Sequence, residues 1–91
     1  MRVVGTTERL EGDFLRGVYE LADRKAKRDI PFADVRTKLG HSEDEAEWAC
    51  EFWADRGILE WTTLGHIALT HVGLRRAERL AEAGWRPYSP F

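Results

Sequence analysis

The side chains best suited to metal chemistry in this sequence are three histidines, His41, His66 and His71, and one cysteine, Cys50. They include no Cys-x-x-Cys pair, and the histidines lack the paired spacing of zinc sites. His66 and His71 flank a predicted strand and are expected at the surface, whereas Cys50 falls among apolar helix residues, where a thiol is inert. The sequence therefore predicts no metal site and no cofactor.

Nucleophilic catalysis by a serine needs a histidine and an acid held beside it, and no such arrangement is indicated around Ser42. Instead, Ser42 stands three residues before Glu45, the spacing of a capping box in which each side chain satisfies a backbone N–H. The glycines show no phosphate-loop spacing, and the acids lie along an open helix face. We therefore expect no catalytic residues, no small-molecule ligand and a protein that is not an enzyme.

Acidic side chains concentrate in residues 42–56, which are predicted to form a helix that ends at Gly57. The segment carries six acids and one base, namely Glu43, Asp44, Glu45, Glu47, Glu51 and Asp55, with Arg56 as the base. Acids near a helix N-terminus stabilise the helix dipole, so the charge alone is explained by a solvated surface.

A solvated charged surface does not explain two aromatic residues on the same helix. Trp48 and Phe52 are spaced i,i+4 on the side away from the predicted core stripe of Ala46, Ala49, Cys50 and Trp53. Large aromatic rings outside the core indicate a contact surface. The candidate protein-interaction residues are therefore Glu47, Trp48, Glu51 and Phe52. A Phe52 half-buried against helix 33–39 would leave Trp48 alone to carry this argument.

Basic side chains gather elsewhere in the chain. The candidate contacts to nucleic-acid phosphate are Arg24, Lys25, Lys27, Arg28, Arg36 and Lys38, and three further arginines, Arg75, Arg76 and Arg79, fall in the last predicted helix. Bases at a helix C-terminus also complement the helix dipole. A third interpretation is that the basic surface docks onto the acidic helix of a neighbouring molecule.

The apolar periodicity and the turn residues predict a mainly α domain with one β-hairpin. Helices are expected at 8–28, 33–39, 42–56 and 70–83, strands at 58–62 and 66–69, and a short extended segment at 30–32. Residues 1–7 are a lead-in and residues 84–91 an aromatic tail. Together, residues 1–91 are expected to form a single domain.

Two apolar stripes run along the first predicted helix. The first comprises Leu10, Phe14, Val18 and Leu21, and the second comprises Leu15, Tyr19, Ala22 and Ala26. Such a wide apolar surface exceeds the one face that a surface helix buries. The second stripe is either covered by the last helix or the tail, or it is the seam of a homodimer.

The composition and net charge indicate which cell compartment and which partners suit the chain. The net charge is −2 with a pI near 5.9, so the chain has no general attraction to nucleic acid. No apolar run is long enough to predict a membrane span or a signal peptide. A single cysteine cannot form an internal disulfide and suits a reducing compartment, so we expect a cytoplasmic protein.

Three short motifs occur in order along the chain: Leu39-Gly40, then Gly57-Ile58-Leu59, then Leu69-Thr70-His71-Val72-Gly73. In this order and spacing the chain resembles the winged helix-turn-helix family of bacterial and archaeal regulators over roughly residues 8–83. The resemblance implies the order helix, short strand, helix, helix, strand, strand, helix, with the hairpin as the wing. It also implies transcription regulation, with the helix after the Leu-Gly turn inserted in the DNA major groove. Small members often dimerise through terminal helices.

The acidic helix argues against that mode of DNA binding. A single carboxylate can accept a hydrogen bond from cytosine, but several without a compensating base are repelled by phosphate. We therefore expect a non-enzymatic winged-helix module of a regulatory assembly that acts through protein contacts or dimerisation. The alternative is a DNA-binding transcriptional regulator that contacts phosphate through the basic residues outside this helix. A third possibility is a scaffold with no regulatory role, because fold alone does not fix function.

Overall fold

The computed structural model describes residues 4–84, with side chains from Leu10 onward. Its elements are α1 (Val4–Leu21), β1 (Ile30–Pro31), α2 (Phe32–Leu39), α3 (Glu43–Asp55), β2 (Leu59–Trp61), β3 (His66–Leu69) and α4 (His71–Glu82). The fold is mainly helical with a small antiparallel sheet, and the predicted order of elements is confirmed. The aromatic tail from residue 85 lies outside the described residues.

The sheet has the strand order β1-β3-β2, with both pairs antiparallel. Ile30 pairs with Ile67, and Leu59 pairs with Leu69, so the hairpin strand β3 lies in the middle. The hairpin turn reaches Gly65, whose φ of 78° suits a residue without a Cβ. The predicted hairpin is thereby confirmed, and the predicted extended segment forms its third strand.

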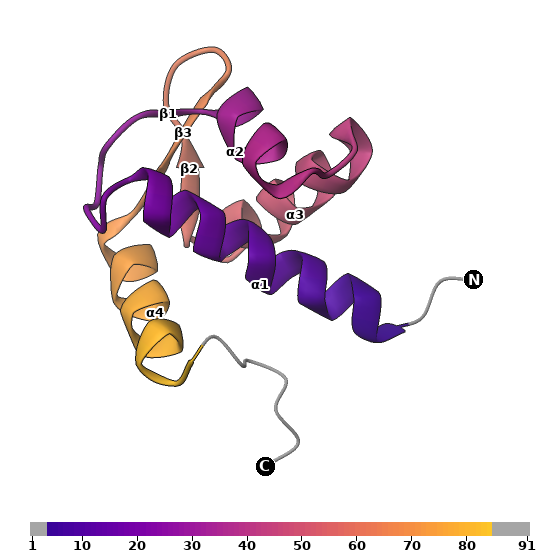
Figure 1. Cartoon of the computed structure of the whole chain (residues 1–91). Coiled ribbons are helices and arrows are strands. Elements are labelled where there is room, and N and C mark those ends of the chain that lie inside the picture. The colour runs from indigo at the N-terminus through magenta and orange to yellow at the C-terminus, as the bar shows by residue number, and fades with distance from the viewer. Residues whose placement is uncertain (1–3, 85–91) are drawn as a thin grey trace.

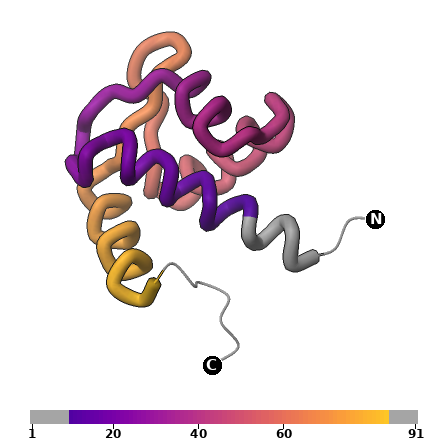
Figure 2. Tube along the Cα trace, in the orientation of Figure 1, coloured from indigo at the N-terminus to yellow at the C-terminus, as the bar shows by residue number. Residues whose placement is uncertain are grey.

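Helix α1 is the element on which the others pack. It contacts α2, α3, α4 and β3, and Figure 1 shows it crossing the molecule with α2 and the sheet above and α4 below its C-terminal half. Figure 2 shows the turn of the β2–β3 hairpin projecting on the side of the molecule opposite α4. The largest fully buried side chains come from α1 and β3: Phe14, Leu15, Val18, Ile67 and Leu69. Each such burial stabilises the fold by about 1.5–3 kcal/mol.

The position of α1 corrects the two ends predicted for the first helix. It begins at Val4 rather than residue 8, and it ends at Leu21 rather than residue 28. Asp23, Arg24 and Lys27 have positive φ angles of 56°, 60° and 64°, which turn the chain back toward the sheet. The N–H of Lys27 then donates to the carbonyl of Leu69 at 2.8 Å. This hydrogen bond and the strand pairing of Ile30 both require the chain to leave the helix early, so they stabilise the turn after Leu21.

The structure also corrects the proposed dimer seam. Leu15 and Ala22 have no exposed surface, Tyr19 is buried, and Ala26 is half-buried in the loop after α1. Because other elements of the same chain pack on several sides of α1, both of its apolar stripes face the chain's own core. The second stripe is therefore not a surface available to another copy.

The last helix begins with a compact cap. The Thr70 side chain accepts a hydrogen bond from the N–H of Gly73 at 2.9 Å and donates to the carbonyl of Gly57 at 2.5 Å. This cap ties α4 to the end of α3. Within residues 4–84, no helix combines the length and apolar character needed to cross a membrane.

Candidate interaction surface

Helix α3 begins and ends as its sequence predicts. The Ser42 side chain accepts from the N–H of Glu45 at 3.1 Å, and the Glu45 carboxylate accepts from the N–H of Ser42 at 3.0 Å. Gly57 follows the helix with a φ of 75°, a conformation that favours glycine. Both ends being fixed, the angular positions of the side chains between them are fixed as well.

The inner face of α3 is the predicted stripe of Ala46, Ala49, Cys50 and Trp53, all of them buried. Trp53 is only 4% exposed, and its indole N–H donates to the backbone carbonyl of Glu11 on α1 at 2.8 Å. A buried indole needs such a partner. This bond therefore sets the rotation of α3 about its own axis relative to α1, and with it the direction of the outer face.

The outer face carries the candidate interaction residues Glu47, Trp48, Glu51 and Phe52, which we call the acidic–aromatic face. Trp48 is 45% exposed. Its ring stacks on that of Phe52, with centroids 5.7 Å apart and an interplanar angle of 28°. The aromatic pair predicted from the i,i+4 spacing therefore exists, and its outer member reaches solvent.

Phe52 is half-buried, and α3 itself supplies its ring and charge contacts. Its ring meets Trp53 edge-on at 5.0 Å, and the Arg56 guanidinium lies 3.6 Å from its centroid. Arg56 also donates to the Phe52 carbonyl at 2.9 Å. The single base of the helix is thus committed to Phe52 in a cation–π contact, a role that the i,i+4 spacing could have indicated but sequence reasoning missed.

The acids on the outer side of α3 form no salt bridge with the described residues. Asp44, Glu47 and Glu51 are exposed, and none of them takes part in a salt bridge within the described part of the chain. On a helix, Asp44 and Glu51 lie one turn to either side of Trp48. The exposed indole is therefore bordered by unpaired carboxylates.

The field of these carboxylates reaches the core. Burial raises the pKa of the Cys50 thiol from its ordinary value of 9.0 to about 12, with smaller contributions from the charges of Glu51 and Glu47. A native thiol with this pKa holds almost no thiolate near neutral pH, and the thiolate is the reactive form. The cysteine is thus a core residue and not a nucleophile.

We predict that Cys50 resists a soluble thiol reagent in the native protein at pH 8 and reacts once the protein is unfolded. The unfolded thiol ionises near pH 9, whereas the native thiol stays protonated up to about pH 12. Its contribution to stability is therefore present below pH 9 and lost as pH rises toward 12. Chemical unfolding between pH 8 and 10 should show a steeper loss for the wild type than for Cys50→Ala. Rapid native labelling, or equal pH slopes, would contradict this assignment.

The six basic candidates differ in their ion pairs and in their exposure. Lys27 pairs with Glu60 of β2 at 2.6 Å, and Lys38 pairs with Glu20 of α1 at 3.4 Å. Glu20 also pairs with Arg16 at 3.1 Å. The remaining candidates are exposed in the loop after α1 (Arg24, Lys25 and Arg28) or half-buried on α2 (Arg36). Two of the six are therefore already engaged with acids of this chain.

The structure adds a second exposed apolar site, on the hairpin. Leu64 at the turn is 99% exposed. Trp61 of β2 is 45% exposed, as Trp48 is, and its ring centroid lies 5.6 Å from that of Phe32. Sequence reasoning predicted the hairpin but missed its apolar tip. The signal was present, because a leucine between Thr63 and Gly65 in a predicted turn has no core to enter.

No arrangement for catalysis or metal binding emerges from the described residues. No group of three or more His, Cys, Asp or Glu side chains among them could hold a metal ion. A pocket of about 330 Å³ lies at the end of α1, lined by Tyr19, Glu20, Asp23 and Arg24. Its lining lacks the paired nucleophile and base that a covalent mechanism requires.

Comparisons of the chain with models of protein families, with curated proteins and with solved structures gave no match.

Proposed function

We propose that this chain is a winged helix-turn-helix module that works in a regulatory assembly through protein contacts made by the acidic–aromatic face of α3. The observation that carries the proposal is the exposed, stacked Trp48 bordered by carboxylates that have no base partner in the described structure. A large exposed ring is typical of a protein-binding surface, where aromatic residues are enriched.

The architecture supports the winged-helix part of the proposal. Helices α2 and α3 are joined by a turn at Gly40 in the left-handed conformation, and α3 leads into a hairpin and then into α4. The close approach of Gly73 to Ile58 gives the Leu-Thr-x-x-Gly motif a structural purpose, since the motif docks α4 on the end of α3.

Electrostatics support protein contacts over insertion in DNA. In the winged-helix arrangement α3 would be the helix inserted in the major groove. Duplex DNA carries one negative charge per 1.7 Å or so of its axis, and the outer face of α3 offers it carboxylates. The competing function is phosphate contact through the basic residues. It would use Arg24, Lys25, Arg28 and Arg36, because Lys27 and Lys38 are paired within the chain.

The test measures the binding of the same protein to duplex DNA and to a protein partner. We expect no binding of the wild-type chain to a fluorescent mixed-sequence duplex at low salt. In affinity capture after nuclease treatment, we expect a protein to be retained by the wild type and by Leu64→Ala but lost with Trp48→Ala. That protein, once purified, should bind the wild type directly. Salt-sensitive duplex binding that falls when Arg24, Lys25, Arg28 and Arg36 become alanine would favour the DNA-binding alternative instead.

Inverting the charge of two acids on α3 tests whether these acids prevent DNA binding. Glu47→Lys combined with Glu51→Lys should convert the chain into a non-specific duplex binder, because two cations replace two anions on the outer face of α3. The logarithm of its affinity should fall with the logarithm of salt concentration with a slope of about −2, one for each new phosphate contact. The control is the same pair of substitutions to glutamine, which removes charge without adding any. Duplex binding equal in the wild type and the lysine variant would contradict the proposal.

A further inference from the structure

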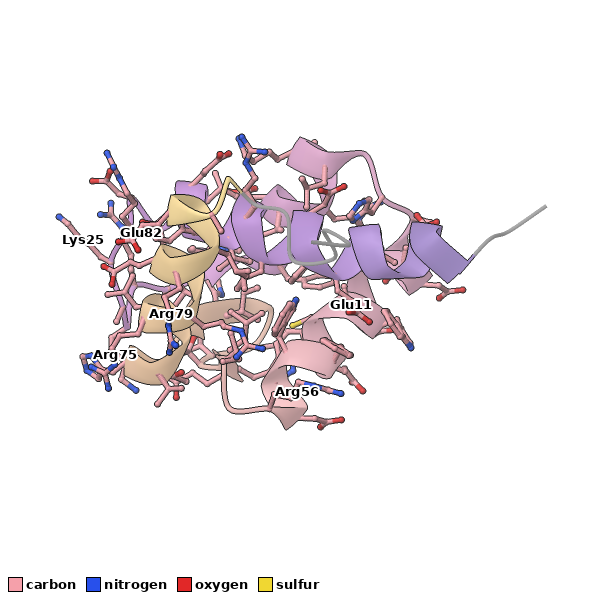
Figure 3. The ribbon with its side chains drawn as sticks, turned by 90° about the horizontal axis from the view of Figure 1, so that it is seen from below. Glu11, Lys25, Arg56, Arg75, Arg79 and Glu82 are labelled. Atoms are coloured by element: carbon pink, nitrogen blue, oxygen red, sulfur yellow. The ribbon has the colours of Figure 1, made fainter. Side chains whose placement is uncertain are left out.

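The outer face of α4 carries an apolar residue followed by two bases. Val72 is 57% exposed although it is apolar, and Arg75 and Arg79 are both exposed. These residues are spaced i, i+3 and i+7, which places them on one side of a helix. We call them the α4 stripe. Figure 3 shows Arg75 and Arg79 on α4 at one end of the molecule.

The outer face of α3 carries an apolar residue followed by two acids at the same spacing. Trp48, Glu51 and Asp55 are exposed and stand at i, i+3 and i+7. We call them the α3 stripe. In both stripes the last residue lies about 10 Å along the helix from the first, at 1.5 Å per residue. If the two helices lie side by side and parallel, the indole of the α3 stripe faces the valine of the α4 stripe. Each carboxylate then faces a guanidinium.

The two stripes are not paired within one chain. The inner face of α3 is turned to the core. The exposed Arg76 of α4 reaches this side of α3, with its guanidinium 5.9 Å from the Trp53 ring. The α3 stripe points the other way, and the α4 stripe lies opposite the inner-facing Ala77. Among the residues described, no salt bridge involves either stripe. Both surfaces are therefore available to another molecule.

We propose that the α3 stripe of one copy docks on the α4 stripe of a second copy, in a head-to-tail contact. The proposal rests on the proposed function, and it names the partner of the acidic–aromatic face as this same chain. Charge complementarity carries it, because one molecule presents both an acidic and a basic stripe with an apolar residue at the matching end. The two acids of α4, Glu78 and Glu82, fall to one side of its stripe at 100° per residue.

The geometry of the contact determines what can be assembled. A head-to-tail interface uses two different surfaces, so each docked copy still offers one free stripe of each kind. Assembly then continues until a ring closes or a chain of copies grows. Close opposite charges at exposed positions are screened by salt, so the assembly should form at low ionic strength and come apart as salt is added.

The test uses two variants that each lose one surface. Trp48→Ala with Glu51→Ala removes the α3 stripe, and Arg75→Gln with Arg79→Gln removes the charges of the α4 stripe. In sedimentation velocity at low salt, the wild type should exceed the monomer size, and each variant alone should be monomeric. A 1:1 mixture of the two should form dimers and nothing larger, because only one intact interface can form between them.

Matched controls separate docking from folding. Leu64→Ala removes an even more exposed apolar side chain from the hairpin and should assemble like the wild type. Circular dichroism of each variant checks that the helices are retained. If the glutamine pair is not folded, the single variant Arg75→Gln, mixed with the α3 variant, replaces it.

Three results would overturn the second-copy assignment: a wild type that stays monomeric at low salt, single-surface variants that assemble as the wild type does, or a mixture that remains monomeric. A monomeric wild type whose foreign partner is lost with Trp48→Ala would remove this inference alone. Duplex binding through α3 would remove both this inference and the proposed function.

Discussion

Replacing Gly73 with alanine is expected to destabilise the protein by about 3 kcal/mol or more, and to lower its midpoint of thermal unfolding by at least roughly 10 °C. A Cβ built at this position would lie 1.9 Å from the carbonyl oxygen of Ile58 and 2.8 Å from its carbonyl carbon. Both are backbone atoms, so the clash is relieved only if α4 moves away from the end of α3. The Thr70 cap on Gly73 would move with it.

The sign of this effect is diagnostic. In an exposed helix, glycine to alanine stabilises by up to about 1 kcal/mol, so a large loss can only come from the close approach. Gly17 of α1 is the matched control, because its added Cβ would meet only the Leu39 side chain, at 3.0 Å from Cδ1. A leucine side chain can shift, and Gly17→Ala should change the unfolding free energy by about 1 kcal/mol or less. Chemical denaturation measures both, and a Gly73→Ala protein as stable as the wild type would refute the packing of α4 described above.

The second large effect is expected at Trp53. Trp53→Ala should cost about 3–5 kcal/mol in unfolding free energy, because the ring is buried between α3 and α1 and its N–H is bonded to the Glu11 carbonyl. Trp53→Phe keeps most of the ring and leaves that carbonyl without its donor, so we expect about 1–3 kcal/mol.

Trp48 supplies the comparison, since it is the same residue type on the same helix. Trp48→Ala should cost about 1 kcal/mol or less, the loss of one exposed ring stack on Phe52. The change in helix propensity is the same in both variants, so the difference between them reports the burial of Trp53 together with its hydrogen bond to Glu11. If Trp48→Ala destabilises as much as Trp53→Ala, then Trp48 belongs to the core and the acidic–aromatic face is not a binding surface.

Much of the fold followed from local chemistry in the sequence. The capping box at Ser42, the cap at Thr70 and the glycine after α3 are short-range signals, and each marks its helix end correctly. The inner stripe of α3 followed from its periodicity, and the need of the Trp53 N–H for a partner was met by α1. These features depend on residues within a few positions of one another or on a single buried group.

The errors came from long-range structure. The early end of α1 is set by residues far along the chain, through the bond from Lys27 to Leu69 and the pairing of Ile30 with Ile67. The turn uses positive φ angles at Asp23, Arg24 and Lys27 without a glycine or proline to mark it. Periodicity likewise identified the second stripe of α1 as apolar but could not say which neighbour covers it.

The candidate surface was predictable in position but not in detail. Helical angles placed Trp48 and the acids on the outer face of α3. They did not show that Arg56 is held by Phe52, or that Lys27 and Lys38 are occupied by acids distant in sequence. Ion pairs of that kind depend on tertiary contacts, which one sequence does not reveal.

The most direct measurement of the central claim follows the backbone amide resonances of α3 in an isotope-labelled chain while mixed-sequence duplex DNA is added at low salt. We expect the resonances of residues 43–55 to stay in place at every DNA concentration, because the anionic outer face is repelled by phosphate. Saturable shifts centred on Glu47, Trp48 and Glu51, suppressed by added salt, would contradict it and would make α3 a DNA-reading helix.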